Sequence, residues 1–183
     1  MKDEDLFIKK AKRGDEKAFG VLYDEYIPRI YRFILLKVSR KQDAEDLTHQ
    51  VFLNAWQNIN RYEFRGFPFS SWLYRIAVNA VIDFYRTNKH EQRLETTPEE
   101  DLSETSELND TVDHVLDITA VKTAVAKLEP DQQNVIIMKF VDDLSNKEVA
   151  QALEKTEGAI RVIQHRALKQ LRAIFNDNKP KEA

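Results

Sequence analysis

FSSWLYRIAVNAVIDFYR, residues 69–86, is the stretch that decides the fold. Within it, apolar residues recur at positions i, i+3, i+4, i+7 and i+11, and these are Leu73, Ile76, Ala77, Ala80 and Phe84. This spacing predicts an amphipathic helix from Ser71 to about Arg86, with one apolar face turned toward a core.

The opposite face of this predicted helix is rich in side chains that suit nucleic acid. It displays Trp72, Arg75, Asn79, Asp83 and Arg86, and the loop before it holds Tyr62, Phe64, Phe67 and Phe69. Aromatic rings stack on unpaired bases, Arg neutralises phosphate, and Asn hydrogen-bonds a base edge. Two interpretations stay open: a surface for a melted DNA strand, or core aromatics beside a solvated Arg face.

The stretch DAEDLTHQVFLNAW, residues 43–56, predicts a second amphipathic helix. Its core face is formed by Ala44, Leu47, Val51 and Ala55, and its outer face by Asp46, Gln50, Leu53 and Gln57. An apolar Leu53 within a polar face indicates a partner protein, although a single exposed Leu is also common in monomeric proteins.

Local signals place two more helices before this one. The first is predicted from about Asp3 to Arg13, ended by Gly14, and Asp15 is placed to cap the next helix. Pro28 is expected to kink or interrupt that second helix, because proline lacks the amide hydrogen of the helical ladder.

The C-terminal third predicts a helix-turn-helix. Helices are expected near Ile118–Lys127, Pro130–Val141, Asn146–Leu153 and Glu157–Phe175. Ser145 and Glu148 form a capping-box pattern, and a short turn at residues 154–156 joins the last two helices. In such a motif the last helix enters the major groove, where Arg161 is able to pair with guanine or phosphate. A helix-turn-helix that binds no DNA is the alternative.

The charge is segregated along the chain. Residues 1–90 hold 16 Lys and Arg against 12 Asp and Glu, residues 91–118 hold 1 against 10, and residues 119–183 hold 11 against 9. The net charge of -3 therefore conceals two mildly basic parts and an acidic strip without aromatics. This composition predicts a flexible linker between two helical domains.

Several classes of protein are excluded by what the sequence lacks. There is no cysteine, so no disulfide framework or Cys-based zinc site is possible. The four histidines are dispersed and no Gly-rich phosphate loop occurs, so we expect no catalysis, no metal and no cofactor. Asp43 and Asp46 are better explained as acids at a helix start than as a metal site. No apolar run reaches about 18 residues and no signal peptide is visible, so we expect a cytoplasmic protein without membrane insertion.

Taken in order, these segments resemble the extracytoplasmic-function (ECF) subfamily of sigma-70 RNA polymerase sigma factors. The resemblance runs from about Leu6 to Arg172, apart from the acidic strip. It rests on residues 43–56 and 69–86, and on a third segment that extends from Leu128, through the capping box, to Arg172. Each segment alone is moderately specific, and the three in this order are highly specific.

The resemblance implies a role for each segment. The 43–56 segment is similar to the one that grips the polymerase clamp helices, and implies core-polymerase contacts by Asp43, Asp46, Leu47, Gln50 and Leu53. The 69–86 segment is similar to the one that melts and reads the minus-ten element, and implies DNA contacts by Phe64, Phe69, Trp72, Arg75, Asn79 and Arg86. The helix-turn-helix implies minus-thirty-five contacts by Asn146, Lys147, Glu157, Arg161, Gln164, His165 and Arg166.

Three positions depart from the family pattern. Gln50 stands where an acidic residue is frequent, Glu154 occupies the place of the usual turn glycine, and Glu157 adds a negative charge at the start of the recognition helix. These departures bear on the clamp contact, the turn geometry and the promoter sequence that is preferred.

The resemblance also implies partners. They are bacterial core RNA polymerase, through the clamp helices of its largest subunit and the flap of its second-largest subunit, together with promoter DNA and an anti-sigma factor. The acidic linker would lie in the basic active-centre cleft and RNA exit path as an RNA mimic, and an ordinary solvated linker is the alternative.

The sequence thus predicts an all-α protein with two small helical domains: residues 1–90, an acidic flexible linker at 91–117, and a helix-turn-helix domain at 118–178. The expected function is promoter recognition and melting on behalf of RNA polymerase. A stand-alone dimeric helix-turn-helix regulator would leave the first domain unexplained. An enzyme that uses the acid pair would lack any convergent catalytic constellation.

Overall fold

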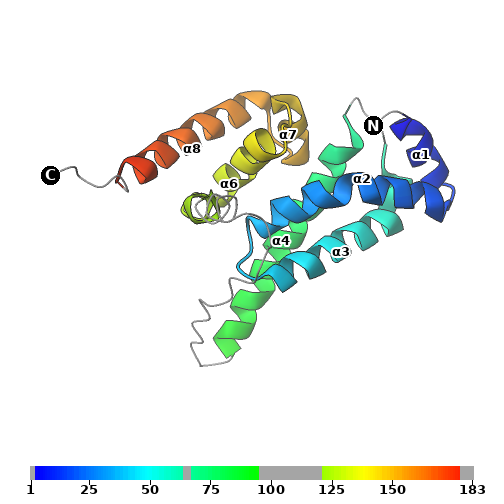
Figure 1. Cartoon of the computed structure of the whole chain (residues 1–183), viewed down its shortest axis with the longest axis horizontal. Helices are drawn as coiled ribbons and strands as arrows, with labels where there is room; N and C mark the ends of the chain where they lie inside the picture. The colour runs from blue at the N-terminus through cyan, green and yellow to red at the C-terminus, as the bar shows by residue number, and fades with distance from the viewer. Residues whose placement is uncertain (1–2, 64–66, 95–120, 178–183) are drawn as a thin grey trace, which may run out of the picture.

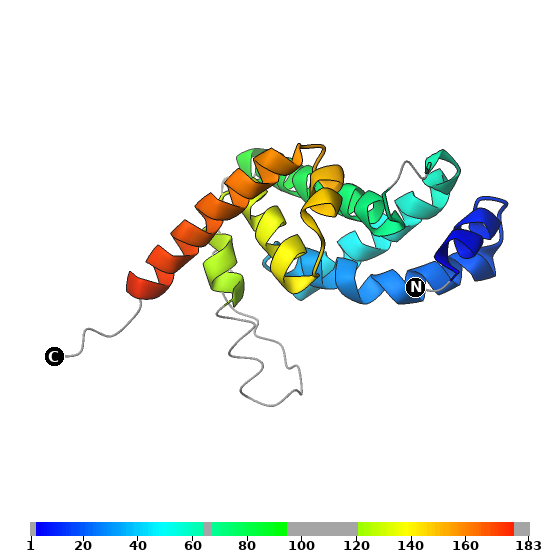
Figure 2. The same ribbon diagram turned by 90° about the horizontal axis from the view of Figure 1, so that it is seen from above.

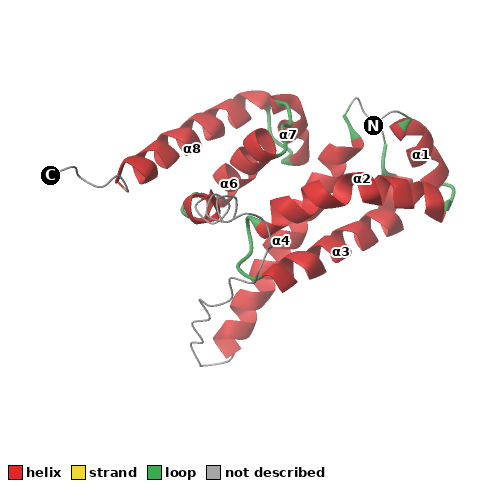
Figure 3. Ribbon diagram, viewed as in Figure 1, coloured by secondary structure: helices red, strands yellow, loops and turns green. Residues whose placement is uncertain are grey.

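The computed structural model describes residues 3–63, 67–94 and 121–177, with the side chains of 89–94 and 177 outside the description. Every regular element in these ranges is a helix, as Figure 3 shows. The predicted all-α fold is confirmed. The predicted linker at 91–117 falls almost entirely outside the described residues.

The N-terminal half consists of four helices and a short 3₁₀ turn. They are α1 Glu4–Ala11, α2 Glu16–Leu35, α3 Lys41–Asn58, η1 Ile59–Arg61 and α4 Phe69–Leu94. Gly14 has a φ of 86°, the left-handed conformation that a glycine adopts without strain, and it ends α1. The Asp15 side chain accepts a hydrogen bond of 3.1 Å from the Ala18 amide, so the predicted cap of α2 is confirmed.

Helix α2 runs through Pro28 without a break, so of the two expected effects, a kink or an interruption, the interruption does not occur. The missing hydrogen bond and the ring clash cost about 3 kcal/mol. Tyr26 and Ile30, on either side of the proline, are buried, and each buried side chain of this size returns about 1.5–3 kcal/mol. The packing of the flanking turns therefore outweighs the local cost.

The core of this half lies between α2, α3 and α4. Its fully buried side chains include Leu22, Ile30, Phe33, Val51 and Leu73. Of the stripe predicted on α4, Leu73 and Ala77 are buried, whereas Ile76, Ala80 and Phe84 are only partly buried. Tyr74, Val78 and Val81, which the stripe did not include, are buried as well. Helix α4 is therefore covered on more than one side.

The C-terminal half is a compact set of helices. After a helical segment at residues 121–126 it contains α6 Pro130–Ile136, the π-helical turn η2 Ile137–Val141, α7 Asn146–Ala152 and α8 Glu157–Asp177. Pro130 is the first residue of α6, as expected. The Glu148 amide donates to Ser145 Oγ at 3.2 Å and the Ser145 amide donates to Glu148 Oε2 at 2.6 Å, so the predicted capping box is confirmed.

Helices α7 and α8 form the predicted helix-turn-helix. Glu154, in the turn between them, has a φ of 53°, the left-handed conformation that glycine usually provides. A residue with a side chain pays about 1–2 kcal/mol for this conformation. The turn geometry of the motif is thus retained, at a cost in backbone strain.

The two halves lie against each other. Figures 1 and 2 show α4 lying with α2 and α3 on one side and with α7 close to its other side, and α8 extending away from α7. Helix α4 is therefore shared between the core of its own half and the contact with the other half. It also reaches Leu94, beyond the domain boundary predicted at residue 90.

The strained turn gives a first prediction. Glu154→Gly and Glu154→Ala both remove the carboxylate, but only glycine adopts a φ of 53° without strain. We expect the Gly variant to be more stable than the Ala variant by about 1 kcal/mol. Chemical denaturation of both variants measures this difference. An Ala variant as stable as the Gly variant would show that the turn is not strained.

Candidate nucleic-acid interface

The aromatic residues before and at the start of α4 form a packed cluster. The Tyr62 ring lies 5.2 Å from Phe69 and 5.4 Å from Trp72, measured between ring centroids. Phe69 also contacts Tyr26, at 5.7 Å, and is only 1% exposed. Phe69 therefore belongs to the core, where it supports Trp72. It is not available to DNA, contrary to what the sequence predicted. Phe64 lies outside the described residues.

A small hollow opens beside this cluster. It has a volume of about 220 Å³ and is lined by Arg61, Tyr62, Glu63, Phe67, Pro68, Ser71, Trp72, Arg75 and Gln151. Ser71 is 1% exposed, and its Oγ has no hydrogen-bond partner among the residues that the structure describes. A buried hydroxyl without a partner is unusual, because its desolvation is then uncompensated. The sequence analysis did not single out Ser71 or Arg61, since neither departs from an ordinary helix start or turn.

Further along α4, the predicted nucleic-acid face is only partly free. Asn79 and Arg86 are exposed, and Arg86 pairs with Asp83 at 3.0 Å. Arg75, in contrast, has its guanidinium 2.8 Å from the Glu154 carboxylate, which belongs to the turn of the helix-turn-helix. The face predicted to bind the minus-ten element is thus in contact with the domain predicted to bind the minus-thirty-five element.

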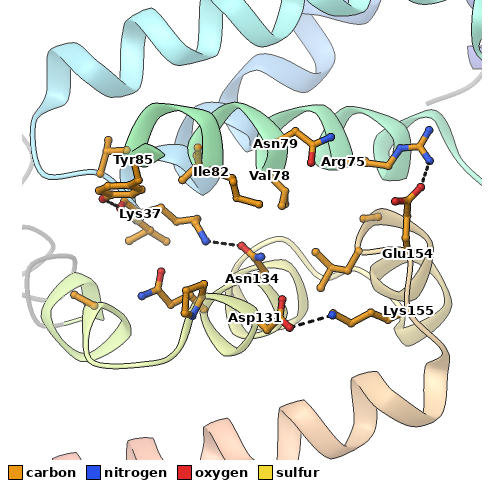
Figure 4. Close-up of a pocket in the computed structure, with 18 of the residues that line it drawn as sticks. Lys37, Arg75, Val78, Asn79, Ile82, Tyr85, Asp131, Asn134, Glu154 and Lys155 are labelled. Atoms are coloured by element: carbon orange, nitrogen blue, oxygen red, sulfur yellow. Dashed lines mark hydrogen bonds and ion pairs between the residues drawn. The ribbon is translucent and has the colours of Figure 1, made fainter. Parts of the chain in front are cut away.

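A cavity of about 590 Å³ separates α4 from the C-terminal half next to this ion pair, as Figure 4 shows. Arg75, Val78, Asn79, Ile82 and Tyr85 line its α4 side. Across it, the Lys37 ammonium donates to Asn134 Oδ1. Burial lowers the pKa of Lys37 to about 8. While this contact persists, Arg75 is only partly exposed and its guanidinium is paired with Glu154.

Three further contacts join the halves. The Lys147 ammonium, predicted to bind DNA, lies 5.3 Å from the centroid of the Phe67 ring. The Lys122 ammonium donates to the Ser39 carbonyl oxygen at 3.1 Å, and the Arg32 guanidinium donates to the Val141 carbonyl oxygen at 3.4 Å. Cationic side chains thus supply most of the polar contacts between the halves.

One buried group opposes the contact. The Asp142 side chain is 0% exposed, neither of its oxygens has a hydrogen bond, and the nearest Arg32 nitrogen is 3.9 Å away. The Tyr74 hydroxyl beside it is also buried without a partner that meets hydrogen-bond geometry. Burial raises the pKa of the Asp142 carboxyl, while Tyr74, Arg32 and Arg29 lower it in part. An ionised carboxylate here costs free energy that its partners only partly return.

The helix-turn-helix presents a polar, largely exposed surface. Lys147, Glu157, Arg161, His165 and Arg166 are exposed, whereas Asn146 and Gln164 are half-buried. Arg161 lies 3.6 Å from the Glu157 carboxylate. The structure therefore brings most of the predicted minus-thirty-five residues onto one accessible surface of α8 and the start of α7.

The predicted polymerase-binding residues lie on α3. Asp46, Gln50 and Leu53 are exposed, and Leu53 keeps 49% of its surface. Asp43 is half-buried and pairs with Arg40 at 3.3 Å, and Leu47 is half-buried against the core. The outer stripe of α3 is thus open in the arrangement that blocks Arg75.

Within the described residues, no group of three or more His, Asp or Glu is placed to hold a metal ion. No helix in that part of the chain is long and apolar enough to cross a membrane. What remains is a set of three surfaces suited to macromolecules: an exposed stripe on α3, an aromatic hollow with a basic helix face on α4, and a helix-turn-helix surface. This combination defines a two-domain helical DNA-binding protein with a protein partner.

Comparison with known proteins places the chain in a family. Residues 22–91 match the model of sigma-70 region 2, and residues 118–171 match that of sigma-70 region 4. The chain is 32% identical over 181 residues to the ECF RNA polymerase sigma factor SigW of Bacillus subtilis, covering 93% of this chain and 95% of SigW. It is 36% identical over 174 residues to the ECF RNA polymerase sigma factor BldN of Streptomyces coelicolor, covering 93% of this chain but 65% of BldN.

The chain belongs to the ECF family of sigma-70 RNA polymerase sigma factors. It is accordingly a transcription initiation factor and not an enzyme, as the resemblance implied. The fold is also that of a solved structure, CnrH in complex with the cytosolic domain of CnrY, with a TM-score of 0.75 over 95% of this chain and 97% of that chain at 21% identity.

The buried carboxylate gives a second prediction. Asp142→Asn keeps the shape and removes the charge, so we expect the contact between the halves to become more stable by about 1–3 kcal/mol. Thermal unfolding and the distance between the halves, measured by single-pair fluorescence transfer, report it. Asp24→Asn is the control, because it removes an exposed carboxylate of α2.

The pH dependence follows from the raised pKa of Asp142. The free-energy penalty of burying the Asp142 charge is absent below the ordinary carboxyl pKa, where the group is neutral whether buried or in water. It is complete above the raised pKa, where the buried carboxyl is ionised. The advantage of Asp142→Asn over the unmodified chain should therefore shrink as the pH falls through this window. An advantage that is independent of pH, or equal for Asp24→Asn, would show that the buried charge does not oppose the contact.

Proposed function

We propose that this sigma factor binds core RNA polymerase through the outer stripe of α3, captures a melted minus-ten base beside α4, and contacts the minus-thirty-five element through α7 and α8. The observation that supports it best is the distribution of exposure. An apolar side chain, Leu53, is exposed within the polar stripe of α3, and basic side chains are exposed on α8. The domain limits 1–90 and 118–178, and the linker between them, are part of this proposal.

The polymerase contact is expected to centre on Leu53. Asp46 and Gln50 lie on the same stripe, two turns and one turn before Leu53 respectively, and provide a polar rim around an apolar centre. Gln50 cannot supply the charge that an acidic residue would, so apolar burial has to contribute more of the affinity. The clamp helices of the largest subunit are the proposed partner for this stripe, and the flap of the second-largest subunit for the C-terminal half.

A third prediction tests this contact. Leu53→Asp should weaken assembly with core polymerase at least tenfold, because a carboxylate would be desolvated in the contact. Leu6→Asp is the matched control: Leu6 is 48% exposed on α1, outside the proposed stripe. Binding of both variants to core polymerase is measured by surface plasmon resonance, with circular dichroism to verify the fold. Equal binding of the two variants would contradict the proposal.

The hollow beside Trp72 is the proposed site for an unpaired base. Its aromatic wall allows stacking, its arginines neutralise phosphate, and Ser71 Oγ has hydrogen-bonding capacity that no described residue uses. Opening a duplex costs a few kcal/mol, and stacking returns about 1–3 kcal/mol per base. We propose that Trp72 and Ser71 hold the base with Phe64, and that Asn79 contacts a neighbouring base edge.

A fourth prediction separates melting from base recognition. Ser71→Ala and Asn79→Ala should each reduce open-complex formation on a duplex promoter by about tenfold, the cost of one buried polar contact. On a promoter with a pre-melted minus-ten bubble, a variant defective in melting recovers and one defective in base recognition does not. Permanganate reactivity of the minus-ten thymines measures both, and Asp24→Asn, at an exposed position of α2, serves as the control. Wild-type reactivity in both variants would mean that these residues only support the fold.

The contact between the halves has a functional consequence under this proposal. Arg75 is paired with Glu154, so the C-terminal half has to leave α4 before the minus-ten strand binds. The stripe on α3 is already exposed, so polymerase is able to bind first and separate the halves. An anti-sigma factor that holds the halves together would keep the protein inactive, and the solved complex of CnrH with CnrY supports such a partner for this chain.

Two parts of the proposal rest on the sequence. The acidic residues of the linker, which lies outside the described residues, are proposed to occupy basic nucleic-acid channels of the polymerase before RNA does. The protein is proposed to act in the cytoplasm, where core polymerase is found. A stand-alone regulator that binds operators without polymerase has no structural support, since the exposed stripe on α3 would then have no partner.

A further inference from the structure

The outward direction of α8 is fixed by its buried residues. Ile160 and Ala167 are 0% exposed and point into the C-terminal half. At 100° per residue, the positions opposite to them are Gly158, Val162, His165 and Lys169. The centre of the exposed face in the first turns of α8 therefore contains a glycine and a β-branched apolar residue, next to His165.

Val162 keeps 50% of its surface exposed. Its neighbours around the helix are Arg161, His165 and Arg166, all of which are exposed. One turn earlier, Gly158 has no side chain, and a Cβ there would meet nothing nearer than Thr156 Oγ1 at 3.9 Å. The isopropyl group thus projects beside Arg161 and Arg166, with the Glu157 carboxylate paired to Arg161, and has open space next to it at Gly158. Basic side chains around it favour a polyanion over an apolar protein surface as the occupant.

Major-groove edges offer one apolar group to such a side chain. Thymine alone among the four bases displays a methyl group in that groove, and short apolar side chains contact it. We propose that Val162 is a specificity-determining residue, which selects thymine at one position of the minus-thirty-five element by contact with its 5-methyl group. This inference rests on the proposed function, namely that α8 enters the major groove there. The charged neighbours would position the helix on phosphates and other base edges.

The test removes the methyl group from the DNA. Holoenzyme is assembled from the full chain and core polymerase, on a promoter obtained by run-off transcription of genomic fragments. Each thymine of the minus-thirty-five element, on either strand, is replaced in turn by deoxyuridine, which keeps every hydrogen-bonding group. Burial of one methyl group corresponds to about a fourfold change in Kd. We expect one deoxyuridine position to weaken binding by about that factor, and Val162→Ala to lose this sensitivity.

Arg161→Ala is the matched variant. It removes the neighbouring side chain on the same exposed face, so it should weaken binding to all promoters while the deoxyuridine effect persists. A deoxyuridine effect of equal size in Val162→Ala, or no effect at any position, would overturn the inference. A scrambled minus-thirty-five element distinguishes failure of the proposed function from failure of the inference about Val162. If scrambling leaves promoter binding by holoenzyme with the unmodified chain unchanged, the proposed role of α8 fails. If scrambling weakens binding but deoxyuridine does not, only the role of Val162 fails.

Discussion

Burial of α4 on two sides is the constraint on which the rest of the structure depends. One side packs on α2 and α3, through Leu73 and Ala77. The other side meets the C-terminal half. Tyr74 and Val78 are buried there, although neither belongs to the apolar stripe that the sequence predicted. A helix in this position both completes a core and carries a binding face, so each change at the contact between the halves also alters what the face is able to bind.

The interactions between the two halves contribute free energies of different sign. The ion pair between Arg75 and Glu154 is largely exposed, and pairs of that kind contribute about 0–1 kcal/mol. Buried Asp142 acts against the contact, because its charge is desolvated without a hydrogen bond. Apolar burial around Tyr74 and Val78 is left as the main favourable term. Such a contact orders the two halves without locking them together, since part of its apolar gain is offset by the carboxylate.

Most of this fold was predictable because local sequence patterns determine where its helices begin and end. Helical spacing located α3 and α4, glycine and aspartate located the start of α2, and the Ser145–Glu148 pair located α7. The residues that were missed depend on tertiary contacts. Tyr74 packs against Phe33 of α2, Phe69 packs against Tyr26 of the same helix, and the tolerance of Pro28 depends on the packing on either side of it. Periodicity shows one face of a helix, so it cannot reveal a helix that is covered on two.

The proposed binding residues also fall into two groups, those that the sequence reveals and those that depend on tertiary contacts. Charged and aromatic residues are recognisable as binding candidates in a sequence, and Arg161, Arg75 and Trp72 were predicted for that reason. Ser71 and Val162 become notable only through their surroundings: a small hydroxyl acquires significance when it is buried without a partner, and an apolar side chain when it is exposed at the centre of a basic helix face. Both observations concern a mismatch between a side chain and its environment, which only a structure displays.

The arrangement of the surfaces also orders the events of initiation. The outer stripe of α3 and the outward face of α8 are exposed together, while Arg75 on α4 is held by the turn that precedes α8. Under the proposed function, binding to polymerase needs no prior rearrangement, whereas capture of a melted base does. Glu154 belongs to the helix-turn-helix, so separation of the C-terminal half from α4 would also withdraw the carboxylate from Arg75. The Arg75–Glu154 pair would thus couple the position of the helix-turn-helix to exposure of the proposed minus-ten face.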